Sequence, residues 1–266
     1  MTKMIMIIAA AGMMIVTAVA PVALPTTITT ASAQVQQSSE DDDDIVTIVS
    51  HRPFKEPMTF PPVQEDFGIT GIIGEVRNDS PNTIGEVDVR GKFYDPNGEL
   101  IHLADGGNAE LSVLRPGERA PFFIPINNAS VSRSIANYTL SPEIGSSNAI
   151  NKPAALKVAI GDHGVVEKEE HVAGIVYEIV GTVTNMGNRP TTYVSVIATF
   201  YDAAGKIIDF KEVGTHPAHI PPGVTADFIF EDPLGAYGNW TAETNRVVSI
   251  NVTAESAEYL SVMESP

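Results

Sequence analysis

The stretch Gly74-Glu75-Val76-Arg77-Asn78 recurs 107 residues later as Gly181-Thr182-Val183-Thr184-Asn185. Two more motifs repeat in the same order. FYDPNG at 93–98 matches FYDAAG at 200–205, again 107 residues apart, and the pair Pro116-Gly117 with Phe122 matches Pro222-Gly223 with Phe228 at an offset of 106. Self-similarity of this kind is the signature of a duplicated structural unit, and its period is too long for a solenoid. The sequence therefore predicts two homologous modules of about 100 residues each.

Both modules are predicted to be β-structure. Apolar and polar residues alternate from Val87 to Phe93, and the second copy places Val194, Val196, Ala198 and Phe200 on the corresponding face. Alternation with a period of two puts one residue set on one face of a strand. The chain after the first 33 residues has no sustained helical period. Short strands, frequent turn residues and module length together favour an all-β fold of two tandem immunoglobulin-like β-sandwiches.

The repeated motifs carry specific turn chemistry. Asp95-Pro96-Asn97-Gly98 is a strong turn, because proline suits its second position, the aspartate accepts backbone N–H groups, and glycine accepts the left-handed conformation. Pro116-Gly117 and Pro222-Gly223 predict a second turn before a strand. Asn78 and Asn185 each end a predicted strand, where an asparagine side chain commonly bonds local backbone.

This set of motifs resembles the FxLYD domain, an immunoglobulin-like module of exported archaeal and bacterial proteins. The resemblance covers residues 68–126 and 174–230. In the pentapeptide that gives the family its name, the first phenylalanine is replaced here by Gly91 in one copy and by Ala198 in the other. The leucine is replaced by Phe93 and by Phe200. The family implies an extracytoplasmic β-sandwich and supplies no catalytic residues.

The N-terminus predicts export. Lys3 precedes an apolar run to Ala20, and Ala31-Ser32-Ala33 is a small-residue cleavage site, so residues 1–33 are typical of a signal peptide. The alternative is an uncleaved anchor, which is the one way in which we expect the chain to contact a membrane.

The rest of the chain divides at changes in composition. Residues 34–44, QVQQSSEDDDD, predict an acidic linker. The first module is assigned to 45–144, the second to 155–254 and a C-terminal tail to 255–266, with Ser141–Pro153 as the joint.

Composition limits the function further. The chain has 266 residues, a net charge of −17 and no cysteine. The charge argues against nucleic acid as a partner, because phosphates need a basic surface. The lack of cysteine excludes disulfides and thiolate chemistry. The sequence also contains no G-x-S-x-G, H-E-x-x-H or P-loop motif, so we expect no enzyme and no cofactor.

Candidate site residues remain few. His216 and His219 form the closest histidine pair and could bind copper or zinc, although no third ligand is evident and the first module has no equivalent pair. Tyr193, Ile197 and Tyr201 lie on the less charged face of their strand, and with Trp240 they form a candidate interface. Five N-x-S/T sequons are candidate glycosylation sites: Asn78, Asn128, Asn137, Asn239 and Asn251.

The sequence thus favours an exported, non-catalytic protein at the cell surface, acting in binding or adhesion or as an accessory ectodomain. Its partner would be a protein or a glycan. Two alternatives stay open: a metal-handling accessory protein that uses His216 and His219, and a structural spacer.

Overall fold

The chain is built almost entirely of β-strands. The computed structural model describes residues 45–55, 68–146, 152–167, 175–233 and 247–262, and the predicted signal peptide and acidic linker lie outside these ranges. The prediction of an all-β chain is confirmed, since sixteen strands and one six-residue helix make up the regular structure described. None of the helical residues described forms a segment long and apolar enough to cross a membrane.

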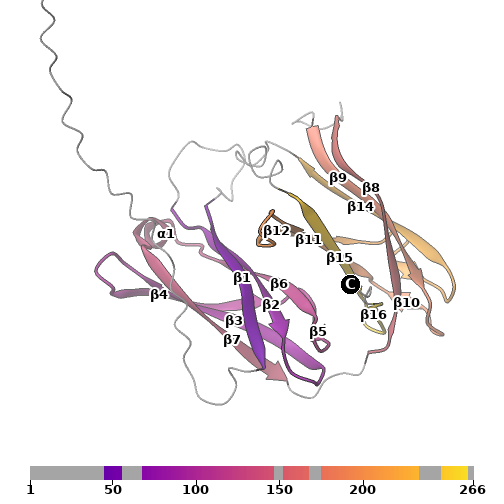
Figure 1. Cartoon of the computed structure of the whole chain (residues 1–266), viewed down its shortest axis with the longest axis horizontal. Coiled ribbons are helices and arrows are strands. Elements are labelled where there is room, and N and C mark those ends of the chain that lie inside the picture. The colour runs from indigo at the N-terminus through magenta and orange to yellow at the C-terminus, as the bar shows by residue number, and fades with distance from the viewer. Residues whose placement is uncertain (1–44, 56–67, 147–151, 168–174, 234–246, 263–266) are drawn as a thin grey trace, which may run out of the picture. The chain divides into compact units, whose positions relative to one another are not determined.

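Residues 45–146, the first half, contain seven strands and the helix (Figure 1). Their bounds are β1 Val46–Phe54, β2 Gly71–Asn78, β3 Ile84–Tyr94, β4 Leu100–Asn108, β5 Val113–Leu114, β6 Arg119–Pro125, α1 Ala129–Ser134 and β7 Asn137–Ser146. Strands β1, β2 and β6 form one sheet, while β4, β3 and β5 form another, in which β7 also pairs with β3.

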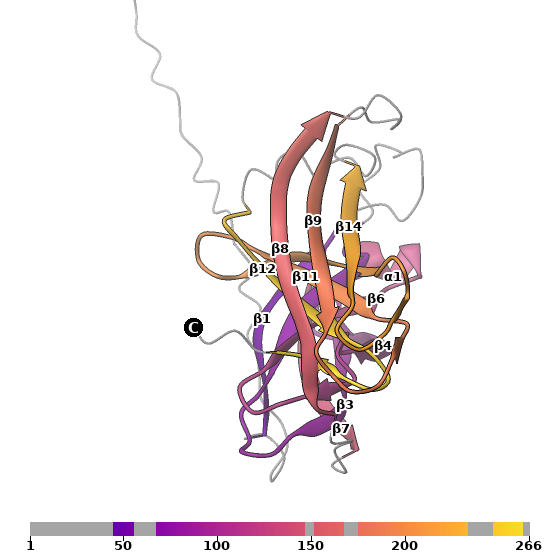
Figure 2. The same cartoon turned by 90° about the vertical axis from the view of Figure 1, so that its right-hand side faces the viewer.

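Residues 152–262, the second half, contain nine strands. Their bounds are β8 Ala154–Glu167, β9 Ile175–Asn185, β10 Thr191–Thr192, β11 Ser195–Tyr201, β12 Ile207–Gly214, β13 His219–Ile220, β14 Thr225–Pro233, β15 Ser249–Glu255 and β16 Leu260–Ser261. Seven of them form one sheet in the order β12-β11-β15-β16-β8-β9-β14, and β10 pairs with β13. Figure 2 shows β8, β9 and β14 running side by side.

Strand pairing repeats between the halves, as the sequence motifs predict. The ladder β1-β2-β6 has its counterpart in β8-β9-β14, and β4-β3-β7 has its counterpart in β12-β11-β15. Glu86 and Tyr193, 107 residues apart, share a left-handed backbone with φ of 49° and 51°. Such a conformation is uncommon outside glycine, and its repetition at one position shows that the duplication extends to local backbone geometry.

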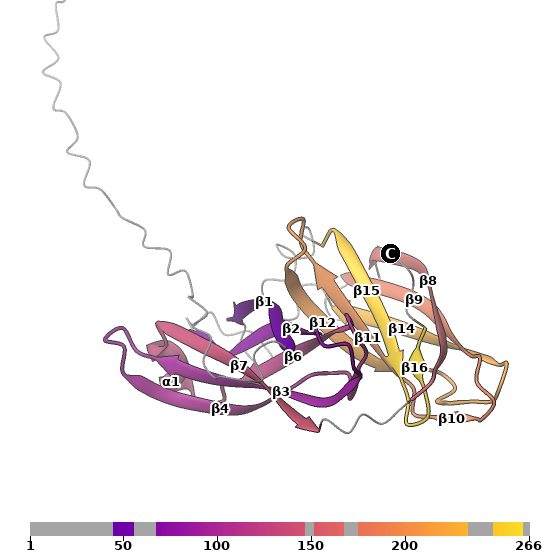
Figure 3. The same cartoon turned by 60° about the horizontal axis from the view of Figure 1, so that its bottom comes forward.

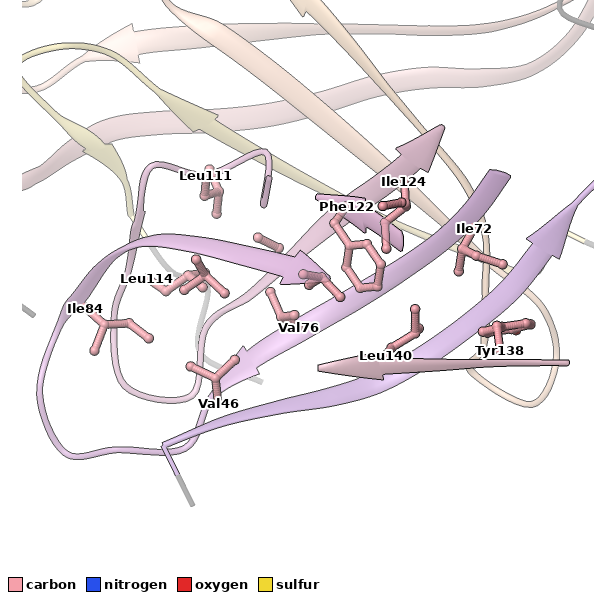
Figure 4. Packing of buried hydrophobic residues seen from close by; sticks show 14 of the residues in the cluster. Val46, Ile72, Val76, Ile84, Leu111, Leu114, Phe122, Ile124, Tyr138 and Leu140 are labelled. Carbon is pink, nitrogen blue, oxygen red and sulfur yellow. The ribbon is translucent and has the colours of Figure 1, made fainter. Parts of the chain in front are cut away.

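Each half has its own group of buried apolar side chains. The first draws on both sheets of residues 45–146, with Ile72 and Phe122 from one and Val89 and Phe93 from the other. Figure 4 shows several of these side chains pointing toward one another. The second is centred on Leu156, Ile179, Phe200 and Phe228. The expected strands around Phe93 and Phe200 are therefore confirmed. The buried apolar side chains form two clusters, and the first also includes Ile197 of the second half.

The repeated glycine of the GxVxN motif makes room for the repeated phenylalanine. A Cβ placed on Gly74 would lie 2.2 Å from the ring of Phe122, and one on Gly181 would lie 2.3 Å from the ring of Phe228. No real Cβ contact is that short, so a side chain at either position would displace a buried ring. Gly91 does the same for Phe93, whose ring would lie 2.6 Å from the added atom.

The repeated asparagine ties three segments together. Asn78 is buried, and its Nδ2 donates to the carbonyls of Asn82 (2.7 Å) and Leu114 (2.9 Å) while its Oδ1 accepts from the Ser80 amide. Asn185 makes the equivalent bonds to Arg189, Ile220 and Gly187. The expectation that these asparagines bond local backbone is confirmed, and the bonds to Leu114 and Ile220 extend it to the distant strands β5 and β13.

The two hairpin turns also match. Asp95 Oδ1 accepts from the amides of Asn97 and Glu99, and Asp202 Oδ1 accepts from those of Ala204 and Lys206. Gly98 and Gly205 close the turns with φ of 81° and 71°. The backbone bond from Glu99 is the main reason why the pKa of Asp95 lies below its usual value.

The boundaries differ from the sequence-based assignment at two places. Strand β7 runs to Ser146, so the predicted joint begins later than Ser141. The predicted tail 255–266 is not merely a tail, because β16 pairs with both β15 and β8, and Tyr259 and Leu260 are buried. A pairing between residues about 100 positions apart leaves no signal in local alternation, which is why this assignment was wrong.

Candidate functional site

The less charged face of β11 lies against the first half. Ile197 is fully buried among the apolar side chains of residues 45–146, and Tyr201 is 8% exposed. Tyr193, by contrast, is 86% exposed. The expectation that this face binds an external partner is therefore wrong for Ile197 and Tyr201, because the first half covers them.

Strand β12 extends this contact. Arg52 Nε on β1 donates to the Ile208 carbonyl at 2.6 Å, and the Ile207 amide donates to Ser50 Oγ at 3.0 Å. Phe210 packs against the apolar cluster of the first half. The junction thus combines apolar burial with hydrogen bonds between side chains and backbone, as stable internal interfaces do.

A buried carboxylate sits in the junction. Glu75, 1% exposed, accepts a hydrogen bond from the Tyr201 hydroxyl at 2.5 Å and from Arg119 Nη1 at 3.3 Å. Burial raises the pKa of the Glu75 carboxyl, whereas the Tyr201 and Arg119 contacts oppose that rise. Loss of hydration therefore outweighs the two contacts, and the junction holds a carboxyl that favours its protonated form more than a solvated glutamate does.

We expect Glu75→Gln to change the pH dependence of stability. Because the folded-state pKa of Glu75 lies above its unfolded value of 4.5, the stability that it contributes is full below that value and is lost as pH rises through the folded pKa. The free energy of unfolding of the wild type minus that of the variant should fall as pH rises, measured by urea unfolding at a series of pH values.

Asp79→Asn is the control with the opposite sign. The Arg77 side chain donates to Asp79 and holds its pKa below the usual 3.8, so its contribution is present above 3.8 and is lost as pH falls. A difference for Glu75→Gln that rises with pH, as for Asp79→Asn, would contradict the assignment.

A polar cluster holds Lys152, the first described residue of the second half, against Ser112 and Glu255. The Glu255 carboxylate accepts from the Ser112 amide at 2.8 Å, from the Ser112 hydroxyl and from Lys152 Nζ. Lys152 Nζ also donates to the Ser256 carbonyl at 3.0 Å and to Ser112 Oγ at 3.1 Å. A serine beside a lysine can be a nucleophile and its base, but here the ammonium donates to three oxygens at once. An ammonium has no lone pair with which to take the serine proton, so the cluster acts as a clamp that joins Ser112 and Lys152 to β15.

Among the residues that the structure describes, no further ligand joins His216 and His219 to form a metal site. His219 is an exposed residue of β13, and the backbone of His216 exchanges hydrogen bonds with that of Asp227. Within the described ranges, no group of three or more His, Asp or Glu side chains is placed to hold an ion. We expect His219→Ala to leave the binding of Cu²⁺ and Zn²⁺ unchanged in calorimetric titrations, and a 1:1 site that this variant abolishes would contradict the expectation.

The asparagines of the predicted glycosylation sequons differ in solvent exposure. Asn78 has both Nδ2 hydrogens donated to carbonyls in a buried position, so a glycan at Asn78 is incompatible with this fold and that prediction is wrong. Asn128, the N-cap of α1, is exposed, as are Asn137 and Asn251, and these three stay predictions. Asn239 and Trp240 lie outside the described residues.

A cleft opens beside the junction. It is lined by Val158 and Ile160 of β8, by residues 250–253 of β15, by Ser261 and Val262, and by the turn at residues 117–119 of the first half. Its volume is about 480 Å³, within the range of about 300–1,000 Å³ found for small-molecule sites. Sequence reasoning missed it, because its walls come from strands that only the tertiary fold brings together.

Comparisons with known proteins give no family. No protein-family model matches the chain, and no curated protein does. Solved structures with partial similarity include the exo-chitosanase CsxA of Amycolatopsis orientalis, at 14% identity and a TM-score of 0.22, covering 75% of this chain and 25% of that one.

Two further structures are similar to the same degree. Red sea bream transglutaminase shows 10% identity and a TM-score of 0.24, with 81% of this chain and 32% of that one covered. A calcium-binding mutant of Bacteroides uniformis beta-glucuronidase 2 shows 14% identity and a TM-score of 0.23, with 81% and 31% covered. The chain spans a quarter to a third of these proteins, and likeness at this level carries no functional conclusion.

Proposed function

We propose that this chain is an exported, non-catalytic binding protein made of two tandem immunoglobulin-like β-sandwich modules of the FxLYD type. It acts at the cell surface as an adhesion protein or as the accessory ectodomain of an assembly. Export is proposed on the pattern of residues 1–33, and the FxLYD type on the repeated motifs.

The repeated strand order supports the module assignment. Each half has a three-stranded ladder and a second ladder whose apolar side chains meet in a common buried cluster, which is how two packed sheets bury their inner faces. The glycine, asparagine and aspartate of the repeated motifs hold equivalent places in both halves. Conserved local geometry at such distant positions is what duplication of one module produces.

The observation that carries the binding function is the cleft beside the junction. The halves are held together by Glu75, Tyr201, Ile197 and the clamp at Glu255, so the cleft walls are kept at a fixed separation. A preformed cleft lined by both apolar and polar residues is suited to recognition, because little ordering entropy is lost on binding. A protein that served only as a spacer would need no such feature.

Capture from envelope extracts tests the proposal. The chain from residue 34 onward is immobilised, and retained molecules are identified by mass spectrometry for proteins and by sugar analysis for glycans. We expect saturable retention of the same partner in independent preparations, competed by the free protein. A spacer would retain nothing that the free protein displaces, and that outcome would overturn the binding function.

A further inference from the structure

Each half has two sheet faces that point away from its own buried cluster. Face A is the outer face of the ladder β1-β2-β6 or β8-β9-β14, and face B is the outer face of β4-β3-β7 or β12-β11-β15. The junction joins face A of the first half to face B of the second, through the hydrogen bond from Tyr201 to Glu75 and the packing of Phe210 on the first half. Figure 3 shows β12 beside β1 and β2. One face of each kind is therefore left outside the junction.

Face A of the second half is exposed. On β9, Val180 and Thr182 are partly exposed and alternate with Ile179 and Val183, which belong to the buried cluster. On β14, Ile229 pairs with Val180 and is 50% exposed. Val180 and Ile229 line a hollow of about 420 Å³, and the ladder that carries them lies toward the viewer in Figure 2. Exposed apolar surface of this kind marks interaction sites.

Face B of the first half is exposed as well. Lys92 on β3 pairs with Leu103 on β4, and Arg90 lies two residues before Lys92 on the same face. Leu103 is 58% exposed, and both basic residues are exposed. Arg90 forms ion pairs with Asp105 and Glu143 of its own half, so its charge is balanced there. Face B thus presents an apolar side chain next to a lysine.

The repeat relates these exposed residues to buried residues of the junction. The counterparts on face A are Val180 for Ile73, Thr182 for Glu75 and Ile229 for Phe123, and those on face B are Tyr94 for Tyr201, Arg90 for Ile197 and Leu103 for Phe210. Within the first half and the junction, Ile73, Glu75 and Ile197 are almost fully buried, whereas their counterparts are accessible. The chain therefore carries a second, exposed copy of each side of its own junction.

We propose that the exposed face A of the second half binds the exposed face B of the first half of a second copy of this chain. The contact repeats the internal junction between two molecules. Leu103 of one copy packs on Val180 and Ile229 of the next, as Phe210 packs on the first half within one chain, and the Tyr94 hydroxyl replaces that of Tyr201. The inference goes beyond the proposed binding function, because the partner is the chain itself.

The chemistry of the two faces favours this partner. Each has an exposed aliphatic side chain, Ile229 on face A and Leu103 on face B, so their contact removes apolar surface from water. On face B the exposed Lys92 pairs with Leu103, and on face A the exposed Asp227 pairs with Thr182. The two faces therefore bring opposite charges to the contact. Faces of the same two kinds already bind each other in the junction.

The contact is head-to-tail, and this predicts how copies assemble. Two different surfaces meet, so a bound copy keeps one accessible face of each kind unless a ring closes. Leu103 stands where the junction has Phe210, and Arg90 where it has Ile197, so we expect the contact between copies to be weaker than the junction and reversible.

Sedimentation velocity tests for self-association. The chain from residue 34 onward is measured at increasing concentrations up to about 1 mM. We expect the mean sedimentation coefficient to rise with concentration. A protein that stays monomeric over the whole range would overturn the proposal.

Two variants and their mixture locate the contact. Ile229→Asp places a charge on face A and leaves face B intact, whereas Leu103→Asp does the reverse. Both side chains are exposed, so we expect both variants to fold, which circular dichroism checks. Each variant alone should associate at least tenfold more weakly than the wild type, and an equimolar mixture should form a 1:1 dimer and nothing larger. A mixture that stays monomeric would overturn the proposal.

Val165→Asp is the matched control. Val165 is 60% exposed on the same ladder, but it pairs with Tyr177 of the buried cluster, so it lies on the opposite side of the sheet from Ile229. Its replacement should change self-association less than twofold. Equal losses for Val165→Asp and Ile229→Asp would overturn the proposal. Association that is weakened by only one of Ile229→Asp and Leu103→Asp would indicate a symmetric contact of two like faces, and this would overturn it as well.

The result is separate from that for the proposed binding function. Capture from envelope extracts measures a different partner, so a wild type that never self-associates would overturn this inference and leave the binding function standing. Conversely, self-association that follows the expected pattern of variants would support the inference even if no envelope partner were retained.

Discussion

Replacement of Asn78 by alanine is expected to lower the free energy of unfolding by about 3 kcal/mol. The side chain is fully buried, and its Nδ2 is a donor to the carbonyls of Asn82 and Leu114, the second of which is itself buried. Alanine removes both donors and the Oδ1 that accepts from the Ser80 amide. A buried polar group left without a partner costs about 1–3 kcal/mol, so several such losses make this one of the largest single effects. Urea unfolding followed by circular dichroism measures it.

The duplication supplies the internal comparison for this prediction. Asn185→Ala removes the equivalent bonds to Arg189, Ile220 and Gly187, so its effect should match that of Asn78→Ala to within about 1 kcal/mol. Asn97→Ala is the matched control, because Asn97 is exposed and its side-chain Nδ2 donates to the carboxylate of Asp95, which is itself only partly buried. It should change stability by less than about 0.5 kcal/mol. Equal losses for Asn78→Ala and Asn97→Ala would contradict the role of burial.

Gly74→Ala is expected to cost about 3 kcal/mol, because overpacking of a filled core usually costs about 1–3 kcal/mol and this contact is unusually short. The added Cβ would lie 2.2 Å from the tip of the Phe122 ring, and that ring is fully buried. The ring cannot move without displacing its own neighbours in the core. Chemical denaturation of the variant and the wild type gives the loss directly.

A second substitution tests whether the ring is the cause. Phe122→Leu shortens the side chain that the new methyl group would strike, so Gly74→Ala should cost less in the Phe122→Leu background than in the wild type. Gly214→Ala is the control on strand β12, since its added Cβ has no neighbour closer than 4.0 Å, and it should change stability by less than about 0.5 kcal/mol. Additive effects of Gly74→Ala and Phe122→Leu would refute the steric explanation.

Local geometry made much of this protein predictable. The glycine of the GxVxN motif leaves space for a phenylalanine ring of the neighbouring strand. The asparagine at the end of the motif forms hydrogen bonds with nearby backbone, and the aspartate of the hairpin accepts hydrogen bonds from the backbone amides that follow it. Each requirement acts over a few residues or across one strand pair, so it fixes a residue type at a fixed position. That is why the repeat, the strands and the turns could be read from the chain with no knowledge of its fold.

Which strand faces are covered by the other half could not be predicted in this way. Alternation assigned Ile197 to one side of its strand, but it could not show that the first half covers that side. The same holds for Glu75, which reads as an ordinary polar residue of an alternating strand and is buried beside Tyr201. Its partner is 126 residues away in the chain, a separation at which sequence patterns carry no information about contact.

The chain by itself determined the repeated motifs, the strands that carry them and their turns, because these depend on short-range sterics and hydrogen bonding. Only the tertiary structure decided which faces are covered, that β16 joins β15 to β8, and that a cleft remains between them. Docking of one half on the other is a balance of desolvation, burial and long-range pairing, and that balance is set by the packed surfaces as a whole.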